Sequence, residues 1–403
     1  MIAAIINGAL VAATALLLVP VAVFTVQVVA AFRRTSPARL AAENEQRPTT
    51  AVLMPAHDEA TGIAAAIGTV LPQLRGGDRL LVVADNCSDR TAAIAAECGA
   101  EVVERRDADR RGKGYALDHG VRHLAAAPPA VVIVVDADCA VTPGAIDLLA
   151  RECARRGRAV QALYLMVAPP GAGLKQRMAE FAWAVRNELR PLGWQRLGGP
   201  CQLMGTGMAF PWATIATASL ATASIVEDMQ LGLDLAAAGS PPSYCAGARV
   251  TSSFPAQGAA SVAQRTRWEH GHLAMITLRG LPMLVSGIVS ANMALVGMAL
   301  DLCVPPLAAL VLSLLGVSFA AAALAAIEGS AAALWLGLGG LVVLAMAVAA
   351  AWVKVGRRSV SLAELALAPI YALAKIPIYV RLFTARQLRW VRTSRDDGEA
   401  DAK

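Results

Sequence analysis

The segment that most constrains the fold is residues 131–138, where five apolar residues lead directly into Asp136, Ala137 and Asp138. Such a run is typical of a strand that is buried on both faces in the middle of a parallel sheet. The two carboxylates then follow the carboxyl end of that strand, where open α/β sheets bind their ligands. Because residues i and i+2 of a strand point to the same side, we expect Asp136 and Asp138 to be neighbours.

The neighbouring carboxylates leave two interpretations open. Mg²⁺ and Mn²⁺ bind carboxylate oxygens together with substrate phosphates, so Asp136 and Asp138 are candidate ligands of such an ion beside a diphosphate. The alternative without a functional role is a solvated strand end before the turn at residues 142–144. The Asp-x-Asp pattern alone does not decide between them.

Strand and helix patterns alternate four times up to residue 138, which predicts a mostly parallel α/β sheet with helices on its faces. The other expected strands cover residues 51–55, 79–84 and 101–103. Helices are expected to begin near residues 59, 91 and 115. Acidic or polar residues follow three of the strands, at residues 57–59, 85–89 and 136–138. Carboxyl ends of parallel strands meet at one edge of the sheet, so these residues predict a single site.

Long uncharged segments indicate a membrane protein, since 56% of the 403 residues are hydrophobic and about twenty apolar residues cross a bilayer. We expect a transmembrane helix at residues 1–32, an interfacial segment at 276–299 and two transmembrane helices within 300–353. Arg33 and Arg34 follow the first segment, which itself lacks basic residues. The positive-inside rule then places the domain at residues 45–275 in the cytoplasm of a multi-pass protein of the inner (plasma) membrane.

Residues 354–403 are expected to form an interfacial amphipathic helix, near 366–385, and a basic cytoplasmic tail. Contact with anionic headgroups accounts for the net charge of +6, so no nucleic-acid partner is needed. The seven cysteines form no Cys-x-x-Cys pair and are expected to be reduced, which argues against zinc and disulfide sites.

Five short segments occur in a fixed order within residues 50–275: 54–59, 85–89, 136–138, 227–228 and 264–268. In these segments the chain resembles the family 2 glycosyltransferases, in the membrane-bound branch that includes cellulose, hyaluronan and chitin synthases and ceramide glucosyltransferase. The Gln-x-x-Arg-Trp run at residues 264–268, which lies just before the apolar segments, is the most specific of the five.

The resemblance implies a GT-A fold, a nucleotide-sugar donor with UDP as the expected nucleotide, and inverting transfer assisted by Mg²⁺ or Mn²⁺. It implies that Asp85 binds the nucleobase, that Asp58 or Glu59 lines the same pocket, and that Asp136 lies near the ribose and diphosphate. At the reaction centre, the resemblance implies that Asp138 ligates the metal together with Asp136 and that Asp228 is the general base. It also implies that Arg267 contacts the diphosphate. The residues that would contact the acceptor are Glu227, Gln264, Trp268 and Gly205. The family often has Asn where this chain has Asp58, which makes that role less secure.

Chemistry supports these roles but leaves alternatives. A carboxylate that removes the proton of an acceptor hydroxyl supplies roughly 10²–10⁴-fold in rate, although Asp228 could instead cap the helix that it opens. Lys113 could bind phosphate at a helix start or lie in a solvated basic loop. Trp268 could carry an acceptor sugar or anchor the chain at the membrane interface. Gly205 could admit the acceptor or form a plain turn.

Three functions compete. The first is a glycosyltransferase of exopolysaccharide or lipid-linked glycan synthesis, and the second is transfer of a single sugar to a lipid. Three spans provide few helices for a polymer channel, so either a lipid or glycan acceptor anchored in the bilayer or an export partner is expected. The third, a nucleotidyltransferase or binding module, should show a Gly-rich loop with Arg and Lys after the first strand. Residues 57–62 have no such loop.

Overall fold

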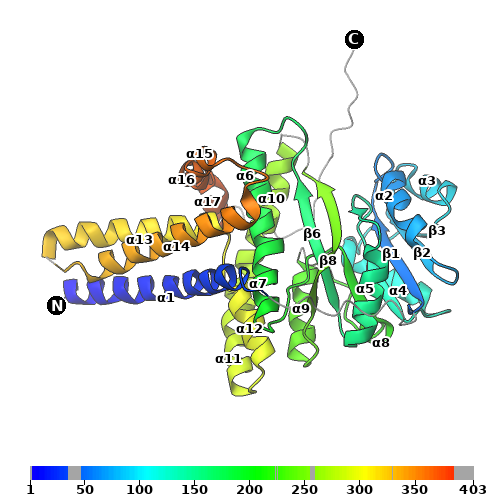
Figure 1. The fold of residues 1–403 in the computed structure, drawn as a ribbon, viewed down its shortest axis with the longest axis horizontal. Coiled ribbons are helices and arrows are strands. Elements are labelled where there is room, and N and C mark those ends of the chain that lie inside the picture. The colour runs from blue at the N-terminus through cyan, green and yellow to red at the C-terminus, as the bar shows by residue number, and fades with distance from the viewer. Residues whose placement is uncertain are drawn as a thin grey trace, which may run out of the picture. The chain divides into compact units, whose positions relative to one another are not determined.

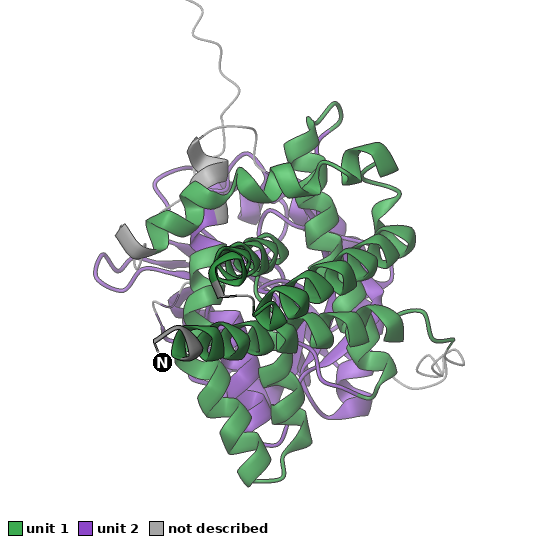
Figure 2. Cartoon of the chain, turned by 90° about the vertical axis from the view of Figure 1, so that its left-hand side faces the viewer, with its two compact units in different colours: residues 1–34, 170–198, 269–387 green, residues 35–169, 199–268, 388–403 purple. Residues whose placement is uncertain are grey.

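The computed structural model describes residues 2–34, 47–222, 224, 226–254, 259–328 and 330–384. The chain forms two compact units, coloured separately in Figure 2. The helical unit comprises residues 1–34, 170–198 and 269–387, and the sheet unit comprises residues 35–169, 199–268 and 388–403. Residues 170–198, which the sequence placed in the domain at 45–275, therefore belong to the helical unit.

In the part of the sheet unit that the structure describes, eight strands form one sheet in the order β3-β2-β1-β4-β7-β6-β8-β5 (Figure 1). Their bounds are β1 Thr50–Ala56, β2 Arg79–Asp85, β3 Glu101–Arg105, β4 Val131–Val134, β5 Ala140–Val141, β6 Val160–Val167, β7 Met208–Pro211 and β8 Ser243–Ser253. Strands β3, β2, β1 and β4 are parallel neighbours. Strand β7 pairs antiparallel with β4 and with β6, and β6 pairs parallel with β8. The predicted mostly parallel α/β sheet is confirmed.

The helices of the sheet unit follow the strands along the chain. They are α2 Ile63–Val70, the 3₁₀ turn η1 Leu71–Gln73, α3 Thr91–Glu97, α4 Lys113–Leu124, α5 Ala145–Arg156, α8 Trp212–Ile215 and α9 Glu227–Ala237. Helix α4 packs on β1 and β2, and α5 packs on β4, β7 and β8. The three expected helices correspond to α2, α3 and α4.

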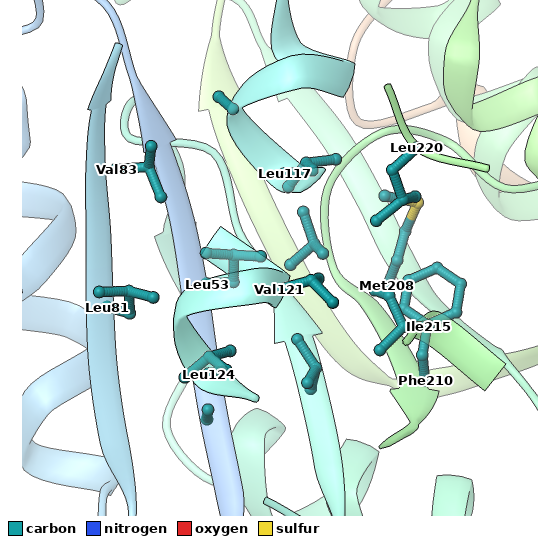
Figure 3. Close-up of a cluster of buried hydrophobic side chains, with 14 of the residues drawn as sticks. Leu53, Leu81, Val83, Leu117, Val121, Leu124, Met208, Phe210, Ile215 and Leu220 are labelled. Carbon is teal, nitrogen blue, oxygen red and sulfur yellow. The ribbon is translucent and has the colours of Figure 1, made fainter. Parts of the chain in front are cut away.

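The central strands are buried on both faces, as the apolar runs predict. Leu53, Leu81 and Val83 meet α4 in one hydrophobic cluster (Figure 3), while the alternating residues Val52 and Val82 are also fully buried. Helix α4 lies very close to this sheet, because a Cβ on Gly120 would come within 2.4 Å of the Leu53 side chain. This close packing fixes the amino end of α4 relative to the strand ends.

The helical unit holds most of the remaining elements. They are α1 Ile2–Ala30, α6 Leu174–Ala184, η2 Val185–Leu189, α7 Arg190–Arg196, η3 Ile276–Gly280, α11 Leu281–Val289, α12 Met293–Leu302, α13 Leu307–Glu328, α14 Ala332–Ala351, η4 Trp352–Gly356, α15 Leu362–Leu365, α16 Ala368–Leu373 and α17 Ile376–Thr384. The segments η2, η3 and η4 are single π-helical turns. Helix α10, Ala259–Met275, carries the chain from the sheet unit into the helical unit.

Among the described residues, four helices are long and apolar enough to cross a membrane: Ile5–Ala30, Thr266–Val289, Leu307–Ile327 and Ala332–Gly356. Three of them match the expected spans, and the fourth includes part of the segment expected at the interface. In Figure 1 the helices α1, α13 and α14 run alongside one another, whereas α11 and α12 run across their direction. That crossing is compatible with an interfacial segment at residues 276–299, which stays a prediction.

Buried polar contacts join the apolar helices of this unit. Arg190 of α7 donates to Gln27 of α1 at 2.9 Å and to the carboxylate of Asp301 of α12 at 2.8 Å. Gln27 donates in turn to Asp301 at 2.6 Å. Isolated charges are costly in an apolar interior, so this closed network stabilises the three helices only as a set.

The segment expected as one interfacial helix near residues 366–385 is instead split into α16 and α17. Pro369 and Pro377 each lie in the first turn of a helix, where the missing N–H is tolerated, and therefore mark two helix starts. Lys375, between the two helices, is only 9% exposed and donates to Glu269 of α10 at 2.6 Å. Its charge is therefore paired inside the helical unit.

Candidate active site

The loops that follow β1 and β2 are tied to each other. The Asp58 carboxylate accepts hydrogen bonds from the Ser88 N–H at 2.6 Å and the Asp89 N–H at 3.2 Å. The Glu59 N–H donates to the Thr91 hydroxyl at 2.8 Å. Burial opposes ionisation of Asp58, but the bonds from Ser88 outweigh it and lower the pKa of Asp58. Asp58 thus holds the second loop in place as an ionised group.

Asp85, the last residue of β2, is only 5% exposed and carries an ion pair. Its Oδ1 accepts from Arg105 at 2.6 Å and from the Asn86 side chain at 3.0 Å. Arg105 ends β3 directly beside Asp85 in the parallel register, and its guanidinium lies over the Tyr115 ring. The sequence ended the third strand at residue 103 and so missed Arg105. A two-residue extension of that strand would have placed Arg105 opposite Asp85.

Two glycines allow Lys113 to begin α4 at the edge of the sheet. Gly112 has a φ of +128°, which L side chains rarely adopt. A Cβ on Gly114 would lie 2.5 Å from the Leu220 carbonyl oxygen, so only glycine lets the loop pass this closely. The Gly-Lys-Gly sequence therefore sets the position of the lysine.

Lys113 is the central cation of a group of carboxylates. Its Nζ donates to the Gly205 carbonyl oxygen at 2.8 Å and forms an ion pair with Asp136. Burial alone would lower the pKa of Lys113, but the charge of Asp136, together with that of Asp228, raises it above its ordinary value. The lysine is therefore not part of a solvated loop, which was the alternative that the sequence left open.

Asp136 and Asp138 follow β4 in a cluster that can hold a cation. Ligand atoms of Asp136, Asp138 and Cys139 all lie within 4.8 Å of one another. Burial raises the pKa of Asp136 although Lys113 opposes it, and the charge of Asp138 adds to the effect. The buried Cys139 thiol has a pKa well above its ordinary value and donates to Asp138 at 3.3 Å. Two carboxylates beside a protonated thiol suit Mg²⁺ or Mn²⁺ better than a soft metal.

Glu227 and Asp228 are the first two residues of α9. The cap position is Val226 and no side chain caps this helix, so the capping alternative for Asp228 is not observed. Burial and the charge of Asp228 raise the pKa of Glu227 to about 8, and this carboxyl keeps its proton at neutral pH. Arg267 lies near Glu227, and burial lowers the pKa of Arg267.

Asp228 and Lys113 also converge on Gly205. A Cβ built there would lie 3.3 Å from Asp228 Oδ2 and 3.6 Å from Lys113 Nζ. Gly205 itself has a φ of +91°. The structure thus brings together, around one point, carboxylates from the ends of β4 and α9, the lysine of α4 and this glycine.

The Gln-x-x-Arg-Trp run lies on α10, which spans Ala259–Met275. Arg267 and Trp268 are half-buried there. The Gln264 side chain lies outside the described residues, so its acceptor contact stays a prediction. Gln161, which is fully buried, was missed by the sequence reasoning, because a polar residue in an apolar strand carries no local signal.

Residues 48–271, more than half of the chain, match the family described as "Glycosyltransferase like family 2". The chain belongs to this family. This family 2 glycosyltransferase is 38% identical over 104 residues to the low-salt glycan biosynthesis hexosyltransferase Agl6 of Haloferax volcanii, a match covering 25% of this chain and 23% of that protein. It is 39% identical over 101 residues to an uncharacterized glycosyltransferase of Mycobacterium tuberculosis, covering 25% of this chain and 42% of the relative. These matches span less than half the length of either relative.

The fold is shared with a solved glycosyltransferase structure. The mannosyltransferase PcManGT of Pyrobaculum calidifontis, in complex with GDP-Man and Mn²⁺, superposes with a TM-score of 0.55 and 18% sequence identity. The likeness covers 94% of this chain and 99% of the mannosyltransferase. The GT-A architecture that the resemblance implied is thereby confirmed, with apolar helices on either side of the sheet domain in the sequence.

Proposed function

We propose that this family 2 glycosyltransferase moves a sugar from a nucleotide-sugar, with UDP-sugar as the expected donor, to a membrane-associated acceptor. The transfer inverts the anomeric carbon and serves exopolysaccharide or lipid-linked glycan synthesis. The observation that carries the proposal is the group of acidic side chains from β4 and α9 around the single lysine of α4. Such an arrangement binds a cation and a diphosphate on one side and a reacting hydroxyl on the other.

The donor side is formed by the strand ends. Asp138, with Asp136, would hold Mg²⁺ or Mn²⁺, which would offset the growing negative charge on the departing diphosphate. The Mn²⁺ bound with GDP-Man in the structure of the mannosyltransferase supports this choice of metal. Lys113 and Arg267 supply further positive charge for the diphosphate. Asp85, in the pair with Arg105, faces the nucleoside end, and Asp58 with Glu59 fixes the adjoining loop.

Asp228 acts on the acceptor. As the general base it removes the proton of the attacking hydroxyl, which then displaces the nucleoside diphosphate in line and inverts the anomeric carbon. Glu227 is protonated at neutral pH and so adds no second negative charge beside the base. Gly205, which carries no side chain, leaves room for the acceptor between Asp228 and Lys113. Trp268 provides an aromatic face for the acceptor sugar, and Gln264 adds a polar contact.

The helical unit supplies the membrane association. The helices at Ile5–Ala30, Leu307–Ile327 and Ala332–Gly356 are proposed to span the inner (plasma) membrane, with the sheet unit in the cytoplasm. The small number of such helices in the described residues favours a lipid-anchored acceptor or a separate export partner over a channel of the chain's own. Transfer of a single sugar to a lipid is the alternative outcome.

A panel of radiolabelled nucleotide sugars tests the proposal. Membranes containing the full chain would be incubated with UDP-sugars and GDP-mannose in the presence of Mn²⁺, and the products separated into lipid-soluble and polymeric fractions. Membranes with Asp228→Asn serve as the matched control. We expect label from one donor in one fraction with the wild-type chain alone. Label that fails to transfer from any donor, or that transfers equally with the variant, contradicts the proposal.

A further inference from the structure

Gln161 is a polar residue in the buried interior of the sheet. All but the last residue of β6 are buried, and Gln161 is 0% exposed. Burying an amide costs free energy unless its hydrogen bonds are made, and the other buried side chains of this strand are almost all apolar. The ladder of β6 does not need a polar side chain, so the reason for Gln161 must lie in what its amide binds.

The amide of Gln161 binds the backbone on both sides of Gly205. Its Nε2 donates to the Thr206 carbonyl oxygen at 2.9 Å, and its Oε1 accepts from the Met204 N–H at 2.8 Å. A further bond joins Nε2 to the Ala162 carbonyl oxygen at 2.9 Å. One side chain therefore holds the N–H of the residue before Gly205 and the carbonyl of the residue after it, in a loop with no regular secondary structure of its own.

Thr206 extends this contact to the residues after β4. Its side chain is 0% exposed, and its hydroxyl accepts from the Asp136 N–H at 3.1 Å. The next residue, Gly207, donates to the Val134 carbonyl oxygen at 2.8 Å. The loop held by Gln161 is thus bonded to the backbone that carries Asp136.

We propose that Gln161 and Thr206 are positioning residues that hold two halves of the reaction centre in register. Gln161 aims the Gly205 carbonyl at Lys113, which it meets at 2.8 Å, and keeps Gly205 against Asp228. Thr206 couples that loop to Asp136. Hydrogen bonds in a low-dielectric interior hold geometry firmly, and reaction rates depend steeply on sub-ångström placement. This inference rests on the proposed function.

The test measures kcat, the donor KM and the thermal stability of four variants of the full chain, each against the wild type. Gln161→Met keeps the length of the side chain and removes all three bonds. Thr206→Val keeps the shape and removes the acceptor for Asp136, whereas Thr206→Ser keeps the hydroxyl. Ser243→Ala is the matched control, because Ser243 is also buried in this sheet and donates to a backbone carbonyl at 3.4 Å.

We expect kcat to fall about tenfold or more in Gln161→Met and Thr206→Val, with donor KM within about threefold of the wild type. Thr206→Ser should restore most of the rate, and Ser243→Ala should keep it. A wild-type kcat in both Gln161→Met and Thr206→Val overturns the positioning roles. If Gln161→Met does not fold, the kcat values of Thr206→Val and Thr206→Ser decide whether this loop positions the reaction centre. A wild-type chain without transfer activity would instead overturn the proposed function itself.

Discussion

Gly205→Ala should damage activity far more than it damages the fold. The substitution has two separable effects, one on the backbone and one on the reaction centre. An L residue at a φ of +91° costs about 1–2 kcal/mol of folding free energy. The new Cβ would also lie 3.3 Å from Asp228 Oδ2, which is tighter than an ordinary contact, so the carboxylate must move by a few tenths of an ångström.

Gly144→Ala is the matched control for the backbone effect. Gly144 has a φ of +80° and a Cβ there would meet nothing within 4 Å. Both variants should therefore lose about 1–2 kcal/mol of stability, measured by denaturation in detergent. Only Gly205→Ala should lose kcat, by about tenfold, because a shift of about 1 Å in a reacting group can cost about 10²-fold.

The assay is release of nucleoside diphosphate from the donor that labels product in membranes. Rates are measured at saturating donor and corrected for the folded fraction of each variant. Equal kcat values in the two alanine variants would refute the reasoning, because they would show that Asp228 and Lys113 do not act at the position that Gly205 keeps open.

Three further predictions follow from the same geometry. Asp228→Asn should lower kcat by roughly 10²–10⁴-fold while leaving the affinity for the nucleoside diphosphate unchanged in calorimetric titration; a near wild-type rate would exclude Asp228 as the base. EDTA should abolish transfer and Mn²⁺ or Mg²⁺ should restore it in the radiolabel assay, whereas undiminished transfer in EDTA would exclude a metal role. Between pH 4.5 and about 8 the folded chain keeps a proton on Glu227 that the unfolded chain has released, so the melting temperature of the metal-free protein should fall as pH rises through that window. Glu227→Gln should flatten this dependence, and an unchanged slope would contradict the raised pKa.

The parallel half of the sheet could be predicted because its information is local. An apolar run such as residues 131–135 specifies a buried strand, and the polar residues after three such runs fall at one edge for reasons of topology alone. Asp136 and Asp138 were placed correctly at the end of β4 on these grounds. The pairing of β7 with β4 and β6 depends on contacts between distant segments that no local pattern reports.

The electrostatic arrangement of the site was less accessible from sequence. From the sequence alone, Lys113 could be a solvated residue as easily as a phosphate-binding one, because its partners Asp136 and Gly205 lie far from it along the chain. The partner of Lys375 was equally hidden, because Glu269, to which it donates inside the helical unit, lies 106 residues away in the chain. For both lysines, the environment is determined by an acidic partner that is distant in the sequence.

The location of Mn²⁺ in crystals of the full chain grown with Mn²⁺ and a nucleoside diphosphate tests the central claim most directly. Anomalous scattering at the manganese edge identifies the ion without reference to any assumed ligand. We predict a single strong peak within coordination distance of Asp138 and the diphosphate, with Lys113 in contact with the phosphate oxygens. A peak remote from Asp138, or a diphosphate bound away from this cluster, would contradict the account.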